Sequence, residues 1–374
     1  MLVVGASGVV GRAAFEHFAR SAGWEAIGVS RRPPDLALGT HRPLDLRDRE
    51  ACREAIAALP PVDHVVYAAL QERPGLVAGW LDRELMETNR RMLEHLLDAL
   101  AEQGGALRHV SLLQGTKAYG AHLGRMRVPG REREARHDHA NFYWLQEDLL
   151  RERAAREGFD FTIWRPPVVY GHAVGSPMNP LAALATYAAV CREEGIGLAW
   201  PGGRTGPVDG VDARLLARAF EWATETEAAR GRVFNVTNGD VFVWENVWAR
   251  LADAFGLAPG EPSPQRLAET MPAKAGLWQE IVRRHGLRSP GLMELVGDSF
   301  VYLDLHLGYG REAAAPATLL STIELRQAGF GECLDSEDML VDWIAWMQRE
   351  RLIPPAPDRR VARVGSRGVQ LEAP

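Results

Sequence analysis

The sequence predicts an α/β fold in which a doubly wound parallel sheet is followed by a smaller, mainly helical lobe toward the C-terminus. Three features lead to this prediction. Short apolar segments alternate with amphipathic segments up to about residue 240, which is typical of parallel strands joined by helices. A glycine-rich turn separates the first apolar segment from the first amphipathic one. After Val241 the alternation stops, and tryptophans in short helical segments between prolines take its place.

The expected strands and helices follow one another from the first residue. Apolar runs predict strands at residues 1–4, 25–29, 42–46, 64–69, 107–113, 161–164 and 233–236. Helical periodicity predicts helices at residues 9–22, 48–59, 75–102, 142–157, 180–191 and 209–223. We expect one domain from residues 1–171 and about 208–240, a substrate lobe from about 172–207 and 241–354, and a flexible tail, rich in Pro, Arg and Gly, at 355–374.

Composition and charge exclude several classes of protein. With 374 residues and a formal net charge of −6, the chain can bury a sizeable core and is not basic enough to predict nucleic-acid binding. Cys52, Cys191 and Cys333 are odd in number and far apart, which favours free thiols in a reducing compartment. The most apolar stretch, residues 181–191, is too short to span a membrane. We expect a cytoplasmic protein that binds neither nucleic acid nor membrane.

The turn after the first strand has the glycine spacing of a dinucleotide-binding site. Gly5, Gly8 and Gly11 form the pattern Gly-x-x-Gly-x-x-Gly, with Ser7 and Val9 between them. Gly5 permits a tight turn, Gly8 lets the backbone approach a pyrophosphate, and Gly11 lets helix pack on strand. The same spacing can occur in a mere tight turn, but its position between a strand and a helix favours a dinucleotide site in a Rossmann-like fold.

The residues after the second strand predict which dinucleotide binds. Folds that bind NAD have an acidic residue here for the ribose 2′-hydroxyl, whereas an arginine accommodates a 2′-phosphate. This chain has Ser30-Arg31-Arg32. Guanidinium groups suit phosphate, so we expect NADPH; the alternative is a solvated arginine pair. The third strand ends at Asp45-Leu46, where adenine is often held, and the fourth ends at Ala69, which should border the nicotinamide ribose.

Tyr143 is the candidate catalytic acid. At about 100° per residue, one face of the helix at 142–157 is apolar, and Tyr143 lies at its edge, where its hydroxyl can reach a cleft. The residues on that face are Phe142, Leu145, Leu149 and Leu150. In short-chain dehydrogenases a lysine usually follows the catalytic tyrosine four residues later, but here that residue is Glu147. The alternative is that Tyr143 only packs at the start of the helix.

Lys117 is the candidate partner of this tyrosine. It follows the fifth strand and is, with Lys274, one of only two lysines in a chain that otherwise uses arginine. An ammonium is a compact charge with a shiftable pKa, whereas a guanidinium stays charged, so we expect a site role for Lys117. Tyr119, two residues away, is a rival tyrosine. His137-Asp138-His139 lacks a third ligand at a recognisable spacing, and no metal is expected.

Together these motifs resemble those of the progesterone 5β-reductase and iridoid synthase family of short-chain dehydrogenases, over about residues 1 to 354. The most specific likeness is Asn141-Phe142-Tyr143 with Glu147-Asp148 and a lysine after the fifth strand. The other matching segments are 5–11, 30–32, 45–46, 115–119, 165–166, 234–242, Trp244 and 278–282. The resemblance implies an extended short-chain dehydrogenase fold, NADPH-dependent reduction of enones, and a homodimer.

The resemblance also implies roles for individual residues. Tyr143 and Lys117 take the catalytic positions, and the NADPH positions correspond to Ser7, Gly8, Val9, Arg31, Arg32, Asp45, Leu46, Val169, Ser176 and Met178. The chain departs from the plant pattern at several pocket positions. Ala69-Leu70 replaces a threonine-tryptophan pair, Leu113-Gln114 a glutamine-threonine pair, Ala118 a histidine and Cys333 a phenylalanine. A steroid or iridoid substrate therefore does not follow from the resemblance.

The function we expect is 1,4-reduction of a small apolar enone or enal. Hydride reaching the β-carbon develops charge on the carbonyl oxygen, where a donor such as the Tyr143 hydroxyl stabilises it, with Lys117 orienting the tyrosine. One alternative is a carbonyl reductase, epimerase or dehydratase on the same fold. Another is a non-catalytic regulator that senses NADP.

Overall fold

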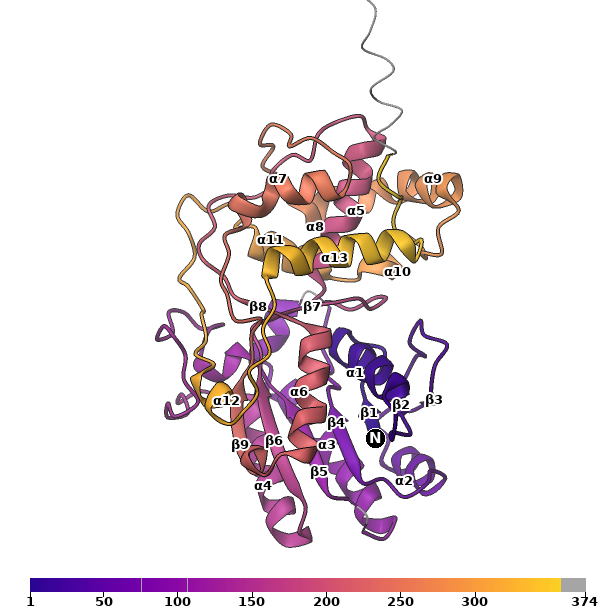
Figure 1. Cartoon of the computed structure of the whole chain (residues 1–374), viewed down its shortest axis with the longest axis vertical. Coiled ribbons are helices and arrows are strands. Elements are labelled where there is room, and N and C mark those ends of the chain that lie inside the picture. Colours follow the sequence, from indigo (N-terminus) through magenta and orange to yellow (C-terminus); the bar gives the residue numbers. More distant parts are fainter. Residues whose placement is uncertain (75, 106, 358–374) are drawn as a thin grey trace, which may run out of the picture.

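The computed structural model describes residues 1–74, 76–105 and 107–357. Its centre is a seven-stranded sheet in the order β3-β2-β1-β4-β5-β6-β9, and every neighbouring pair is parallel (Figure 1). The strands are β1 (Leu2–Val4), β2 (Ile27–Ser30), β3 (Thr40–Pro43), β4 (His64–Tyr67), β5 (His109–Leu113), β6 (Asp160–Arg165) and β9 (Arg232–Asn235). The predicted doubly wound parallel sheet is thus confirmed.

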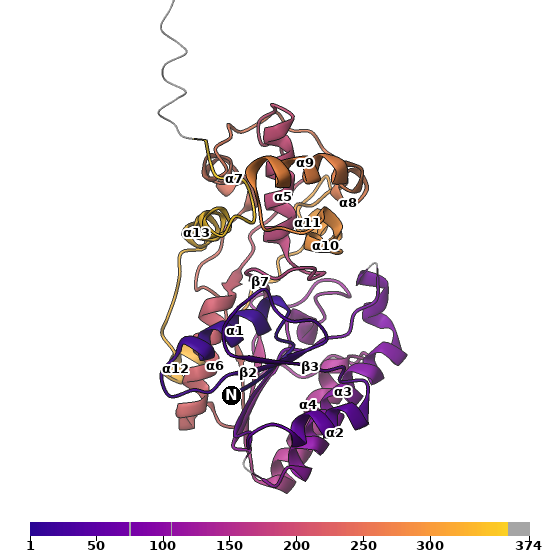
Figure 2. The same cartoon turned by 90° about the vertical axis from the view of Figure 1, so that its right-hand side faces the viewer.

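Helices cover both faces of this sheet. Alternate residues of β1 point to opposite faces: Leu2 and Val4 lie in one apolar core and Val3 in another, so the strand is apolar throughout. On one face lie α1 (Val9–Arg20) and α6 (Ala213–Glu225). Three helices cover the opposite face, as Figure 2 shows: α2 (Arg49–Ala57), α3 (Arg83–Glu102) and α4 (Phe142–Glu157).

Beyond the carboxyl ends of the strands lies a group of helices (Figure 1), seven among the residues that the structure describes. They share an apolar core that includes Trp244, Trp278 and Trp343. They are α5 (Pro180–Glu193), α7 (Trp244–Ala254), α8 (Leu267–Thr270), α9 (Ala275–His285), α10 (Leu292–Val296), α11 (Ser299–His306) and α13 (Ser336–Arg349). A two-stranded parallel sheet of β7 (Val168–Tyr170) and β8 (Gly210–Asp212) lies at the junction. The short helix α12 (Ile323–Gln327) packs beside β9, and the division into two domains stays a prediction.

Three predicted elements were wrong in their bounds. The strand expected at 42–46 is Thr40–Pro43, a largely exposed edge strand without an apolar run. The helix expected at 75–102 is interrupted: the 3₁₀ helix η1 (Leu76–Leu81) precedes α3, because the Asp82 side chain accepts hydrogen bonds from the amides of Glu84 and Leu85 and starts a new helix. The segment 209–223 begins with β8, and Asp212 then caps α6.

The flexible tail expected at 355–374 stays a prediction. The carbonyl of Pro355 accepts a hydrogen bond of 2.7 Å from the Arg192 side chain, so packed chain continues past residue 354. The rest of the predicted tail, residues 358–374, lies outside the described residues. Among the helices that the structure describes, none is both long and apolar enough to cross a membrane.

Candidate active site

A cavity of about 610 Å³ lies at the carboxyl ends of β1, β2, β4 and β5, beneath the helices of the C-terminal half. This is where ligands bind in doubly wound sheets. Nearly every residue predicted for the site lines it: Gly5, Ser7, Gly8, Val9, Ser30, Arg31, Arg32, Asp45, Leu46, Ala69, Lys117, Tyr143, Val169, Ser176 and Met178. Gly11 lies beneath the turn instead, where a Cβ would come within 2.1 Å of the Gly5 carbonyl oxygen.

The glycine turn fits a pyrophosphate. Gly5 has φ +89°, a conformation that favours glycine. Gly8 is the N-cap of α1 and has no side chain with which to cap the first-turn amides. A Cβ on Gly8 would meet only the Gly5 carbonyl oxygen, at 3.5 Å, so a ligand can approach the backbone here. The positive end of α1 and its amides therefore suit an anionic group.

The far end of the cavity suits a 2′-phosphate. Arg31 and Arg32 are exposed and line the cavity. Within the described part of the chain, Arg31 donates to Gln71 Oε1 at 3.1 Å and Arg32 to the Val174 carbonyl at 3.5 Å, and the charge of Arg31 also acts on the Asp45 carboxylate. Both retain free donors, since each guanidinium has five N–H groups. These contacts leave the charges available to an anionic ligand.

Asp45 does not replace the acid that NAD-binding folds use at this end. Its carboxylate accepts hydrogen bonds from the Arg47 side chain at 2.9 and 2.6 Å. This hydrogen bonding holds the pKa of Asp45 at about 2. Asp45 still lines the cavity beside Leu46.

The first turn of α4 sets the position of Tyr143. The Asn141 side chain accepts a hydrogen bond of 3.0 Å from the Tyr143 amide and donates one of 3.1 Å to the Lys117 carbonyl. One N-cap therefore links the two candidate catalytic residues. Tyr143 is 8% exposed, and its hydroxyl is 3.2 Å from the position of a Cβ on Gly115. Burial raises the pKa of Tyr143, so the hydroxyl stays protonated and can donate a hydrogen bond.

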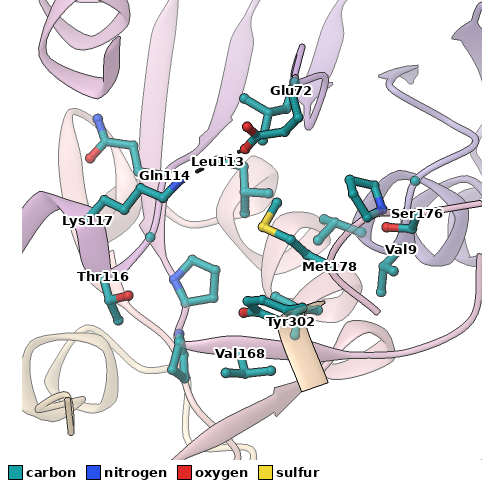
Figure 3. Close-up of a pocket in the computed structure, with 18 of the residues that line it drawn as sticks. Val9, Glu72, Leu113, Gln114, Thr116, Lys117, Val168, Ser176, Met178 and Tyr302 are labelled. Atoms are coloured by element: carbon teal, nitrogen blue, oxygen red, sulfur yellow. Dashed lines mark ion pairs between the residues drawn. The ribbon is translucent and has the colours of Figure 1, made fainter. Parts of the chain in front are cut away.

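Lys117 lies in the 3₁₀ helix η2 (Thr116–Tyr119), directly after β5. Its ammonium is 3.8 Å from Glu72 Oε1 and 4.0 Å from the centroid of the Trp80 ring. Figure 3 shows its side chain pointing toward Glu72, with their ion pair dashed. Burial lowers the pKa of Lys117 to about 8, and the Glu72 carboxylate opposes this shift.

The predicted apolar face of α4 was wrong only at Leu145: Leu150 is buried, and Phe142 and Leu149 pack against buried clusters. Leu145 is 36% exposed, whereas Gln146 and Glu147 are buried. Glu147 lies outside the cavity lining and accepts a hydrogen bond of 3.1 Å from Gln114, which also donates to the Tyr143 carbonyl at 3.2 Å. The helix therefore buries paired polar side chains against the sheet, which periodicity of apolar residues does not register.

The rival tyrosine, Tyr119, packs away from the cavity. It is 2% exposed, and its hydroxyl donates a 2.6 Å hydrogen bond to Asn235. Burial raises the pKa of Tyr119 to about 12. Its interactions connect η2 to β9, and it does not line the cavity.

Comparison with known proteins gives the family. Residues 1–237 match the model of the NAD dependent epimerase/dehydratase family. The chain is 31% identical to an (S)-8-oxocitronellyl enol synthase of Nepeta racemosa, over 94% of this chain and 92% of the relative. It is 30% identical to the 3-oxo-Delta(4,5)-steroid 5-beta-reductase of Arabidopsis thaliana, over the same shares of the two chains. The chain belongs to the NAD dependent epimerase/dehydratase family. Within it, the predicted likeness to iridoid synthases and progesterone 5β-reductases is confirmed.

Similar solved structures confirm the fold. A UDP-glucose 4-epimerase of Thermotoga maritima superposes with a TM-score of 0.64 at 17% identity, over 93% of this chain and 98% of that one. The Thermus thermophilus UDP-glucose 4-epimerase, solved with NAD, gives a TM-score of 0.61 at 20% identity, over 92% and 98%. As a member of the NAD dependent epimerase/dehydratase family, this chain is an enzyme that uses a nicotinamide cofactor.

The cavity residues that escaped the sequence analysis include four with polar or aromatic side chains: Glu72, Trp80, Tyr302 and His306. The rings of Tyr302 and His306 pack edge to face, 4.4 Å apart, on α11. Burial lowers the pKa of His306 to about 4. Each of the four residues comes from a segment without a recognisable motif. Only the tertiary structure places these segments together at the cavity.

Proposed function

We propose that this enzyme uses NADPH to reduce a C=C bond conjugated to a carbonyl group in a small apolar enone or enal. The names of the relatives support the reaction class, because both an enol synthase and a steroid 5-beta-reductase are among them. The observation that carries the proposal is the meeting of Tyr143 and Lys117 at one cavity wall, linked by Asn141.

NADPH would lie across the carboxyl ends of the strands. The turn from Gly5 to Val9 would hold its pyrophosphate, and Arg31 and Arg32 its 2′-phosphate. Residues at the ends of β3 and β4 and between β7 and α5 would hold the rest: Asp45, Leu46, Ala69, Val169, Ser176 and Met178. The cofactor supplies the hydride when bound; the protein supplies position and electrostatics.

Tyr143 would donate its hydroxyl hydrogen bond to the carbonyl oxygen of the substrate. Hydride addition at the β-carbon moves charge onto that oxygen, so this donor stabilises the transition state more than the ground state. Burial keeps the hydroxyl protonated. The Lys117 ammonium would keep the local potential positive and favour the enolate.

The absence of lysine four residues after Tyr143 favours enone reduction over carbonyl reduction. An alkoxide needs a full proton, whereas an enolate is less basic and is stabilised by a hydrogen bond. At this position Glu147 is bound by Gln114 and Arg165, outside the cavity lining. No proton relay of the Tyr-x-x-x-Lys type is therefore available from α4.

The test is to locate the transferred hydride. The enzyme is incubated with NADPH deuterated at the transferable position and with a panel of cyclic and linear enones and enals, and each product is analysed by mass and NMR. We expect deuterium on the β-carbon of a saturated carbonyl product. Deuterium on a carbinol carbon, with the double bond intact, would identify a carbonyl reductase. Tight NADPH binding with no turnover of any compound in the panel would favour the alternative of a non-catalytic regulator that senses NADP.

A further inference from the structure

Glu72 is a buried carboxylate in the cavity to which neither the family motif nor the chemistry above assigns a role. Its side chain is 9% exposed, and its Oε1 lies 3.8 Å from the Lys117 ammonium. Among the described residues, Oε1 has no hydrogen-bond partner. Trp80 packs its ring face on the same ammonium, at 4.0 Å. Glu72 and Trp80 thus both contact the Lys117 ammonium, and all three residues line the cavity.

The backbone that carries Glu72 is fixed by a buried amide on α3. Asn89, 1% exposed, accepts a hydrogen bond of 2.8 Å from the Gln71 amide and donates one of 3.0 Å to the Gln71 carbonyl. The Gln71 side chain in turn donates to the Glu72 carbonyl at 2.8 Å. Glu72 therefore has a defined position beside Lys117, although it lies in a loop.

Stability alone does not explain this carboxylate. Burying a charge is costly unless hydrogen bonds and close ion pairs offset the lost solvation. Glu72 has one long ion pair and an unbonded oxygen, and burial raises its pKa. Under-satisfied buried charges of this kind are concentrated at functional sites.

Resting on the proposed function, we propose that Glu72 is a positioning residue, whose carboxylate keeps Lys117 charged and directed along the cavity wall beside Tyr143. Glu72 thereby sets the upper pH limit of the reaction. The interaction is electrostatic and needs no contact between Glu72 and the substrate. It acts at short range in a partly buried site, where screening by salt is weak.

The direction of the pH effect follows from the charges. A carboxylate favours the ammonium form of a neighbouring lysine, so removing it must lower the pKa of Lys117 from about 8. The other titratable groups around this pair are His122, Tyr143 and Tyr302. His122 is partly buried and has its pKa lowered to about 4, and the pKa of each tyrosine is raised. None of the three changes charge between about pH 6 and 9, so the alkaline limit reports Lys117.

A lysine NMR titration tests the inference without any substrate. The chain has only two lysines, Lys117 and Lys274, so protein labelled with ¹³C at lysine Cε gives two signals. In Glu72→Gln we expect the titration midpoint of Lys117 to fall by about one pH unit or more. The Lys274 signal, from the surface, should titrate as in wild type. An unchanged Lys117 midpoint would overturn the proposal.

Activity provides the second arm. Glu72→Gln should move the alkaline limb of the kcat profile toward acid by the same amount. Turnover should then fall about twofold at pH 7 and about tenfold above pH 9, while turnover below pH 6 changes little. The matched control is Glu84→Gln, which removes an exposed carboxylate paired with Arg73 at 3.1 Å, and should leave the limb in place. An alkaline limb that does not move in Glu72→Gln contradicts the proposed role.

Two further outcomes separate the possible failures. If wild type reduces no enone, the proposed function fails, and the NMR arm still decides the role of Glu72. If Glu72→Gln does not fold, Glu72→Asp replaces it. Aspartate keeps the negative charge, but its side chain is one methylene shorter, so the carboxylate lies farther from Lys117. The titration midpoint of Lys117 should then fall by less than in Glu72→Gln, and a midpoint equal to wild type would overturn the proposal.

Discussion

Two buried ion pairs lie on either side of the start of α4, and they are built differently. On the sheet side, Glu147 and Arg165 are 3.4 Å apart, and Glu147 also binds Gln114 at 3.1 Å and Arg151 at 2.9 Å. On the cavity side, Lys117 and Glu72 are 3.8 Å apart, and the facing oxygen has no hydrogen bond among the described residues. All four side chains are at most 15% exposed.

The net pKa shifts of the two carboxylates are opposite. Burial raises the pKa of both, but Arg165 and the other donors outweigh it at Glu147, whose pKa is lowered. At Glu72 the Lys117 ammonium and the Trp80 side chain do not outweigh it, and the pKa is raised. The cations differ too, because arginine stays charged and lysine can lose its proton. We infer that the sheet-side pair fixes α4, whereas the cavity-side pair is adjustable and serves the chemistry.

The largest effect should come from the hydroxyl between the two pairs. We expect Tyr143→Phe to lower turnover of weakly activated enones by about 10²–10³. The measurement is steady-state kinetics with a matched Tyr119→Phe variant. The Tyr119 hydroxyl binds Asn235 away from the cavity, so Tyr119→Phe should cost about 1 kcal/mol of unfolding free energy and little turnover. Equal losses of turnover in both variants would contradict the assignment of Tyr143.

Removing the cavity-side cation comes next. Lys117→Met should lower turnover by about 10², while the circular dichroism spectrum and NADPH affinity stay close to wild type. Lys274→Met is the control, since Lys274 lies on the surface and pairs with Glu194. If Lys117→Met turned over at the wild-type rate, the distinction between the two ion pairs would lose its functional meaning.

A third pair of charges, exposed at the far end of the cavity, should affect binding alone. We expect the double variant Arg31→Ala, Arg32→Ala to weaken NADPH by more than tenfold and NADH much less, since each charge-assisted contact contributes about 1.5–3 kcal/mol. Affinities come from fluorescence titration with each nucleotide. Wild-type affinities that are equal for NADPH and NADH would remove the basis for the predicted cofactor choice.

The sequence predicted those parts of the site in which a short local motif is sufficient to indicate a function. The glycine turn, the arginine pair and the rare Lys117 could each be identified from a few neighbouring residues, and all line the cavity except Gly11. Six of the seven parallel strands were predictable for the same reason, because each is a short apolar run; the exposed edge strand β3 is the exception.

Tertiary contacts account for what the sequence did not show. Glu72 lies between the predicted strand at 64–69 and the predicted helix at 75–102, in a segment without a motif. Trp80 lies in the 3₁₀ helix η1, where the start of a long helix was expected, and its ring contacts Lys117. Tyr302 reaches the cavity from α11, far away in the sequence. The burial of Gln146 and Glu147 on α4 was not predicted, because these side chains are buried through pairing, not through apolar character.

The unfolding free energies of Glu147→Gln and Glu72→Gln, from urea denaturation at pH 7, test the difference between the two pairs most directly. Glu147→Gln should lose about 3 kcal/mol, because it leaves the permanently charged Arg165 buried with one carboxylate fewer. Glu72→Gln should lose less than about 1 kcal/mol, because Lys117 can release its proton when its partner is gone. Equal losses in the two variants, or a larger loss in Glu72→Gln, would contradict this account.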